Sequence, residues 1–85
     1  MNEDQLAQLE LEAAIGRRAK SAYDGYLKEY VEIQNKELYE RFISDSVSTQ
    51  EAINIKISQS AFNALERGIL SDIETGKLAE IQLGK

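Results

Sequence analysis

The side chains that could carry chemistry in this sequence are carboxylates, hydroxyls and amines, because it contains neither histidine nor cysteine. Without those two residue types, the chain cannot build a histidine-activated nucleophile, a thiolate site or an ordinary zinc site. Glu37 and Glu40 could meet on one helix face as an acid–base pair, but such carboxylates on a solvated helix are normally surface charges. No lysine stands at a spacing that would activate a serine. We therefore expect no enzymatic activity, no cofactor and no metal site.

The only basic cluster is formed by Arg17, Arg18 and Lys20, which could contact phosphate or an acidic partner. The same three charges also fit a solvated helix face, since no aromatic residues are interleaved with them. The whole sequence has 15 acidic and 10 basic residues and a net charge of −5, which disfavours broad binding to a nucleic-acid backbone. The glycines are isolated from one another, so no glycine-rich phosphate loop is present.

The basic cluster and the Glu37–Glu40 pair both fall within one long amphipathic helix that the sequence predicts. At 3.6 residues per turn, eight apolar residues fall on one continuous stripe: Ile15, Ala19, Ala22, Tyr23, Tyr26, Leu27, Tyr30 and Ile33. Asn2 and Gln5 fit a capping box at the start of this helix, and Gly16 could allow a bend within it. The pattern predicts a first helix from about residue 3 to about residue 43.

A second long helix follows a break over residues 44–48, where serines and an aspartate compete for backbone hydrogen bonds. Ser48 and Glu51 fit a second capping box, which predicts a helix over residues 49–83. Isoleucines at positions 53, 55 and 57 alternate with polar residues as in a strand, but a helical pattern accounts for far more of this half. We therefore expect a helix here, in which Gly76 could form a left-handed C-terminal cap.

The predicted fold is all-α: residues 1–85 form a single domain, an antiparallel hairpin of two long helices. Its packed centre is expected to contain Tyr26, Tyr30, Phe62, Leu65 and Ile69. One seam between two helices buries too little apolar area to stabilise a chain of this size, so we expect a homo-oligomer or a bound protein partner. Five apolar residues outside the main seam form the predicted partner interface: Leu6, Leu9, Leu70, Leu78 and Ile81.

The stretch from Ile73 to Leu83, Ile-Glu-Thr-Gly-Lys-Leu-Ala-Glu-Ile-Gln-Leu, resembles the end of a group of small helical proteins of tailed bacteriophages. The similarity also includes Glu51, Ile57 and Leu65, with a looser match over residues 38–42. Proteins of this group are often encoded close to head and DNA-packaging genes. The resemblance implies a viral protein that acts inside an infected bacterium or in a virion, and it assigns no activity to particular residues.

Three functions are compatible with these features. The first is an assembly or binding module whose apolar helix faces contact its own copies or a larger phage protein. The second is an inhibitor that uses its acidic surface against a basic host or defence protein. The third is a small DNA-binding regulator or packaging subunit, in which residues 53–57, whose alternation departs from the phage pattern, would form the strand of a ribbon–helix–helix protein. The acidic N-terminus and the lack of a long apolar run predict a soluble, cytoplasmic protein without a membrane span, and the phage resemblance adds the virion as a second location.

Overall fold

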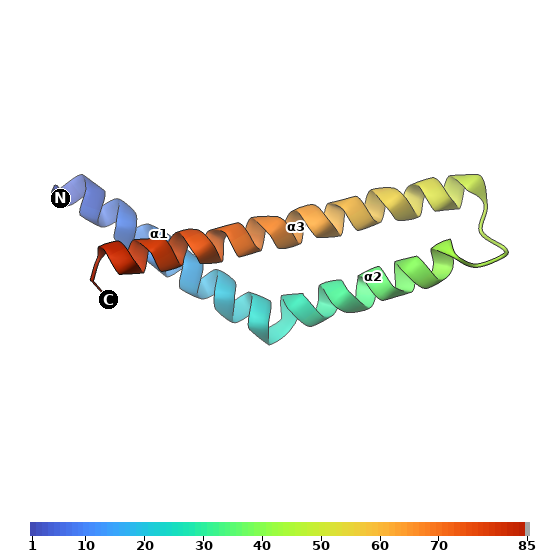
Figure 1. Ribbon diagram of the computed structural model, residues 1–85, viewed down its shortest axis with the longest axis horizontal. Coiled ribbons are helices and arrows are strands. Elements are labelled where there is room, and N and C mark those ends of the chain that lie inside the picture. The colour runs from blue at the N-terminus through green and yellow to red at the C-terminus, as the bar shows by residue number, and fades with distance from the viewer. Residues whose placement is uncertain (85) are drawn as a thin grey trace.

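The computed structural model describes residues 1–84 as a bent helix that folds back onto a long straight one (Figure 1). Its elements are α1 (Glu3–Ala22), a π-helical turn η1 (Tyr23–Leu27), α2 (Lys28–Phe42) and α3 (Thr49–Gln82). These residues contain no strand, which confirms the all-α class and the helical hairpin. Residues 53–57 lie within α3, so their alternating pattern does not produce a strand.

The helix ends follow the local capping signals. The Asn2 side chain accepts a hydrogen bond of 2.8 Å from the Gln5 amide, and the Asn2 amide donates one of 3.1 Å to the Gln5 side chain, which confirms the capping box. Ser48 caps α3 by accepting from the Glu51 amide at 3.1 Å. The Glu51 carboxylate does not complete a second box but accepts a hydrogen bond of 3.0 Å from Arg41. That ion pair links the end of α2 to the start of α3.

The bend in the first half lies at the π-helical turn, where α1 passes into α2 (Figure 1). The sequence left open whether the helix bends at Gly16 or continues through it, and the structure shows a continuous helix there, since Gly16 is a buried residue inside regular α1. A π-turn holds one residue more than an α-turn, so it rotates the following helix by about 100° relative to the preceding one. The predicted stripe departs from the buried side already within α1, ahead of this turn, because Ala13 and Gly16 are buried whereas Ile15 is exposed.

The side chains that are buried differ from the predicted stripe in both α1 and α2. The inward residues of α1 are Ala13 and Gly16, and those of α2 are Val31 and Leu38. The stripe residues Ile15, Tyr26 and Ile33 are instead exposed, along with others on the same side. The buried partners on α3 are Ile55, Ile73, Gly76 and Ala79.

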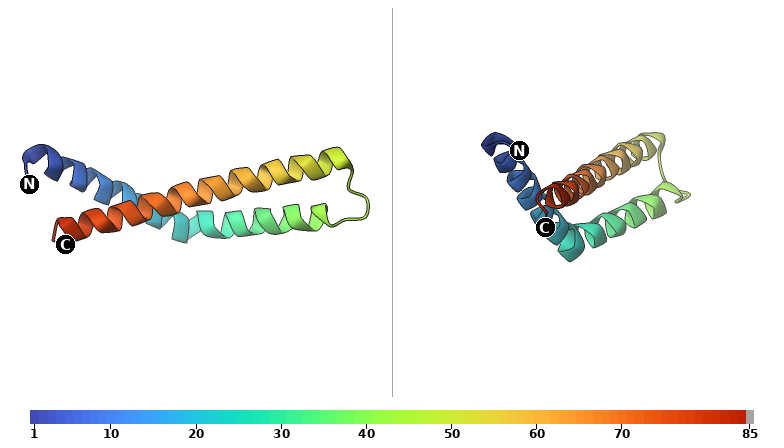
Figure 2. Two further views of the ribbon diagram at one scale, coloured as in Figure 1. Left: turned by 45° about the horizontal axis from the view of Figure 1, so that its top comes forward. Right: turned by 60° about the vertical axis from the view of Figure 1, so that its left-hand side comes forward.

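Two glycines set the crossing of α1 over α3, which both views in Figure 2 show. A Cβ atom built on Gly16 would lie 2.6 Å from the Gly76 Cα, and one built on Gly76 would lie 2.6 Å from the Gly16 Cα. Ala13 and Ala79, each three residues away, are both 1% exposed at the same crossing. The predicted cap at Gly76 was therefore wrong: this glycine is needed for close backbone approach, and the positive φ of 77° occurs at Gly84.

The molecule is a long, thin slab with extents of 60 × 21 × 13 Å. Its radius of gyration is 18.1 Å, against about 12 Å for a compact chain of this length. Its accessible surface is 6225 Å², against about 5,100 Å² for a compact protein of 9.6 kDa. In the view down the shortest axis α2 and α3 lie side by side as a single layer, whereas α1 crosses α3 (Figure 1).

Candidate partner-binding surface

Two of the three residues in the basic cluster form ion pairs within the chain. Arg17 binds Glu80 of α3 at 2.8 Å, and Lys20 binds Asp24 one turn along at 2.9 Å. Arg18 is exposed and has no ion pair with any residue in positions 1–84. The cluster therefore presents one uncompensated cation rather than three, which is a weak attraction for phosphate.

Three residues of the predicted partner interface share one exposed side of α3, and the other two lie on α1. Leu6 and Leu9 lie near the start of α1, where Leu6 is exposed and Leu9 half-buried. Leu78 and Ile81 of α3 are 53% and 71% exposed, and Leu70 is also exposed. Because Leu78 follows Gly76 by two positions, it lies on nearly the opposite side of α3 from the crossing with α1.

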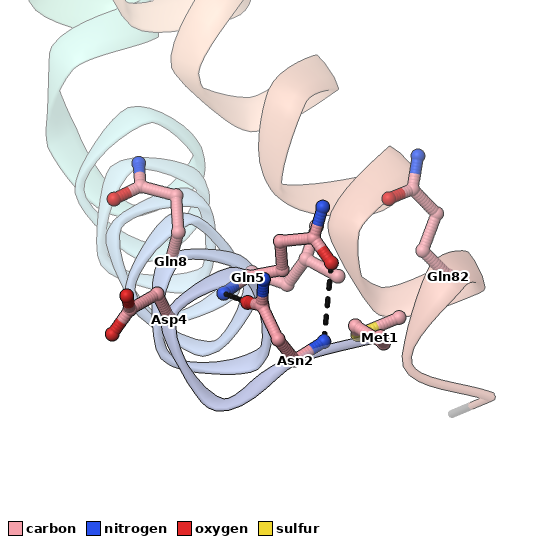
Figure 3. A pocket seen from close by; sticks show the side chains of 7 residues that line it. Met1, Asn2, Asp4, Gln5, Gln8 and Gln82 are labelled. Carbon is pink, nitrogen blue, oxygen red and sulfur yellow. Dashed lines mark hydrogen bonds between the residues drawn. The ribbon is translucent and has the colours of Figure 1, made fainter.

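A pocket of about 510 Å³ opens between the start of α1 and the end of α3 (Figure 3). Its lining consists of Met1, Asn2, Asp4, Gln5, Gln8, Leu9 and Gln82. The polar groups of Asn2 and Gln5 are hydrogen-bonded to each other's backbone and form the helix cap, as the dashed lines in Figure 3 show. Asp4 is the only charged side chain in the lining, so the pocket offers little to fix the orientation of a ligand.

The five residues predicted to form the packed centre form a surface cluster instead, and we call it the tyrosine patch: Tyr26, Tyr30, Phe62, Leu65 and Ile69. The rings of Tyr26 and Tyr30 are stacked with centroids 5.6 Å apart, and Tyr30 meets the Phe62 ring edge-on at 6.2 Å. Leu65 follows Phe62 by three residues and Ile69 follows Leu65 by four, so both extend the same side of α3.

The prediction that this cluster is buried was wrong. Tyr26 is 62% exposed and Leu65 is 50% exposed, while Tyr30 is exposed to a smaller extent. Phe62 and Ile69 are half-buried. The physical reason is that Val31, Leu38 and Ile55 fill the seam between α2 and α3, which leaves the patch on one flank of that seam.

The other flank of the same seam is polar. Asn35 donates a long hydrogen bond of 3.5 Å to Asn63, and the Lys56 ammonium lies 4.6 Å from the centre of the Phe42 ring. The Asn35 side-chain oxygen is buried without a donor, which weakens this side of the seam. The α2–α3 pair thus has one apolar and one polar flank, as an element does when a second layer covers it.

Tyr23 connects the π-helical turn to α3. Its hydroxyl donates a hydrogen bond of 3.1 Å to the Glu66 carboxylate. Desolvation raises the pKa of Tyr23 above its ordinary value of 10.0, and the hydrogen bond to Glu66 and the charge of that carboxylate raise it further. The neutral phenol is therefore the form that the folded structure favours.

Gly16 and Gly76 are the structurally important residues whose role the sequence analysis missed. The available signal was the pairing of small residues three apart, Ala13 with Gly16 and Gly76 with Ala79, which allows helix backbones to approach closely.

Between residues 1 and 84, no helix is both long and apolar enough to cross a bilayer. The same residues contain no group of three acidic side chains placed to hold a metal ion. Comparisons with protein-family models, with curated proteins and with solved structures gave no match.

Proposed function

We propose that this protein is a non-enzymatic binding or assembly module that acts by presenting apolar helix surface to another protein chain. One observation carries the proposal: in the described residues, far more large apolar side chains are exposed than buried. Fifteen are exposed, whereas the buried ones are only Val31, Leu38, Ile55 and Ile73. An exposed apolar surface that is larger than the buried core is typical of a protein that binds a partner.

The alternatives have less support. A ribbon–helix–helix regulator needs a strand, and residues 53–57 are helical. The cluster at Arg17, Arg18 and Lys20 is largely neutralised by Glu80 and Asp24. An inhibitor that works through acidic charge is compatible with the net charge of −5, but the exposed apolar side chains would have no role in it.

The resemblance of residues 73–83 to small helical phage proteins suggests where such a module would act. We infer assembly inside an infected bacterium or in a virion, with a larger phage protein as one class of partner. That inference comes from the sequence pattern of α3 alone.

The proposal can be tested with the tagged full-length chain. Sedimentation over a range of concentrations and affinity capture from phage-infected cells should together reveal self-association or a specific protein partner. A lysine substituted at an exposed apolar position of the surface that binds should abolish the complex while circular dichroism still shows an intact helical fold. A chain that stays monomeric at all concentrations and captures nothing would contradict the proposal.

A further inference from the structure

We infer that the partner of the tyrosine patch is a second copy of this chain, which packs its own tyrosine patch against the first about a two-fold axis. The inference rests on the proposed function and specifies both the surface and its occupant. The two hairpins would then form a four-helix bundle in which α2 and α3 of each copy supply one layer.

The first argument is the thickness of the molecule. Stable domains consist of at least two packed layers, each covering the apolar face of the other. Along the shortest axis, where the molecule measures 13 Å, α2 and α3 lie side by side as one layer (Figure 1). No second element of residues 1–84 covers the patch, because Tyr26 and Leu65 at its centre are 62% and 50% exposed.

The second argument is the area that a dimer would cover. The chain exposes 6225 Å², about 1,100 Å² more than the roughly 5,100 Å² of a compact protein of its mass. A standard stable interface buries about 800 Å² on each partner. Covering one flank of the hairpin with an identical copy would therefore bring the exposed surface of the chain to an ordinary value.

The third argument is the composition of the patch. All five of its residues are uncharged, so the patch itself brings no like charges together when two copies meet. Its tyrosines come from η1 and α2, whereas Phe62, Leu65 and Ile69 come from α3, so a two-fold axis can place the tyrosines of one copy on the α3 residues of the other. The stacked Tyr26 and Tyr30 rings are already ordered, which lowers the entropic cost of association.

The test compares two double variants of the full-length chain by sedimentation equilibrium. Tyr26→Lys with Leu65→Lys alters the patch, and Leu78→Lys with Ile81→Lys alters exposed apolar residues elsewhere on α3. Both variants raise the net charge equally, so a difference between them cannot come from overall repulsion. All four positions are exposed and lysine is a good helix former, so both variants should keep the helical circular dichroism of the wild type.

We expect a wild-type dimer whose dissociation constant rises about a hundredfold in the patch variant and stays within about threefold in the other. A wild-type monomer would overturn the inference, and so would a dimer that only Leu78→Lys with Ile81→Lys dissociates. In the latter case the proposed function would stand with a different surface. A monomer that still captures a defined phage protein would likewise overturn the inference alone, whereas a monomer that captures nothing would overturn both.

A second readout uses the absence of cysteine in the native sequence. One chain carries Tyr26→Cys and a separately purified, tagged chain carries Leu65→Cys, and the two are mixed under oxidising conditions. The two-fold packing predicts a disulfide between unlike chains. Exchange of the Leu65→Cys chain for a Leu78→Cys chain should remove that product, and equal yields from both mixtures would contradict the packing.

Discussion

The lack of a side chain at Gly76 allows α1 and α3 to cross in close contact. A methyl group added at this position would meet the Gly16 Cα at 2.6 Å, and neither backbone can move away without separating α1 from α3. We expect Gly76→Ala to destabilise the fold by about 1–3 kcal/mol because overpacking outweighs the gain in helix propensity. Urea titration at a fixed protein concentration measures this change.

Gly68 provides the matched control on the same helix. A Cβ atom at this position meets nothing within 4 Å, so alanine gains helix propensity without a clash. Gly68→Ala should therefore stabilise the protein by about 0.5–1 kcal/mol. Equal effects of the two substitutions would show that α1 and α3 do not approach closely at Gly76.

Tyr23 should make stability sensitive to alkaline pH. Its pKa is raised in the folded state, so its contribution is complete below pH 10.0 and is lost as the pH rises through the higher folded value. Tyr23→Phe should therefore reduce the fall in unfolding free energy above that pH. Tyr39→Phe is the control, because Tyr39 is exposed and its hydroxyl has no hydrogen-bond partner within residues 1–84. An identical alkaline decline in both variants would count against the Glu66 contact.

At the scale of the elements, the π-helical turn decides which side of α2 faces α3. Deleting Gly25 should return the turn to α-helical geometry and rotate α2 by about 100° relative to α1. Val31 and Leu38 would then leave the seam, so we expect a loss of several kcal/mol, as for buried aliphatic residues that lose their packing.

The control for that deletion is Gly25→Ala, which keeps the chain length. A Cβ at Gly25 meets nothing within 4 Å, so this substitution should leave stability unchanged or slightly raised. Thermal unfolding followed by circular dichroism compares the two. A deletion variant as stable as Gly25→Ala would mean that the rotational phase of α2 is not fixed by the turn.

The helix ends could be predicted from the sequence, because capping and turn residues determine them locally. The start of α1, the break after α2 and the start of α3 depend on caps and turn residues a few positions apart, and these were visible in the sequence. The π-turn had no comparable signal, because residues 23–27 also fit a regular α-helix. The apolar residue types correctly predicted that the rings of the tyrosine patch lie together, but they did not predict that the patch is exposed.

The whole molecule carries a net charge of −5, so two copies repel each other while their apolar patches attract. Raising the salt concentration from about 20 mM to about 200 mM should screen this repulsion and strengthen self-association. An inhibitor that binds a basic partner through acidic charge would show the opposite dependence. Dimerisation that weakens steadily with added salt would therefore argue against an apolar interface.

Sedimentation equilibrium of the wild-type chain tests the central claim most directly, namely that the hairpin is completed by another copy. The prediction is a concentration-dependent mass that approaches twice 9.6 kDa and does so at lower concentration in higher salt. The melting temperature should rise with protein concentration in the same samples. A mass of 9.6 kDa at every concentration, with a cooperative melting transition that does not shift, would contradict the claim.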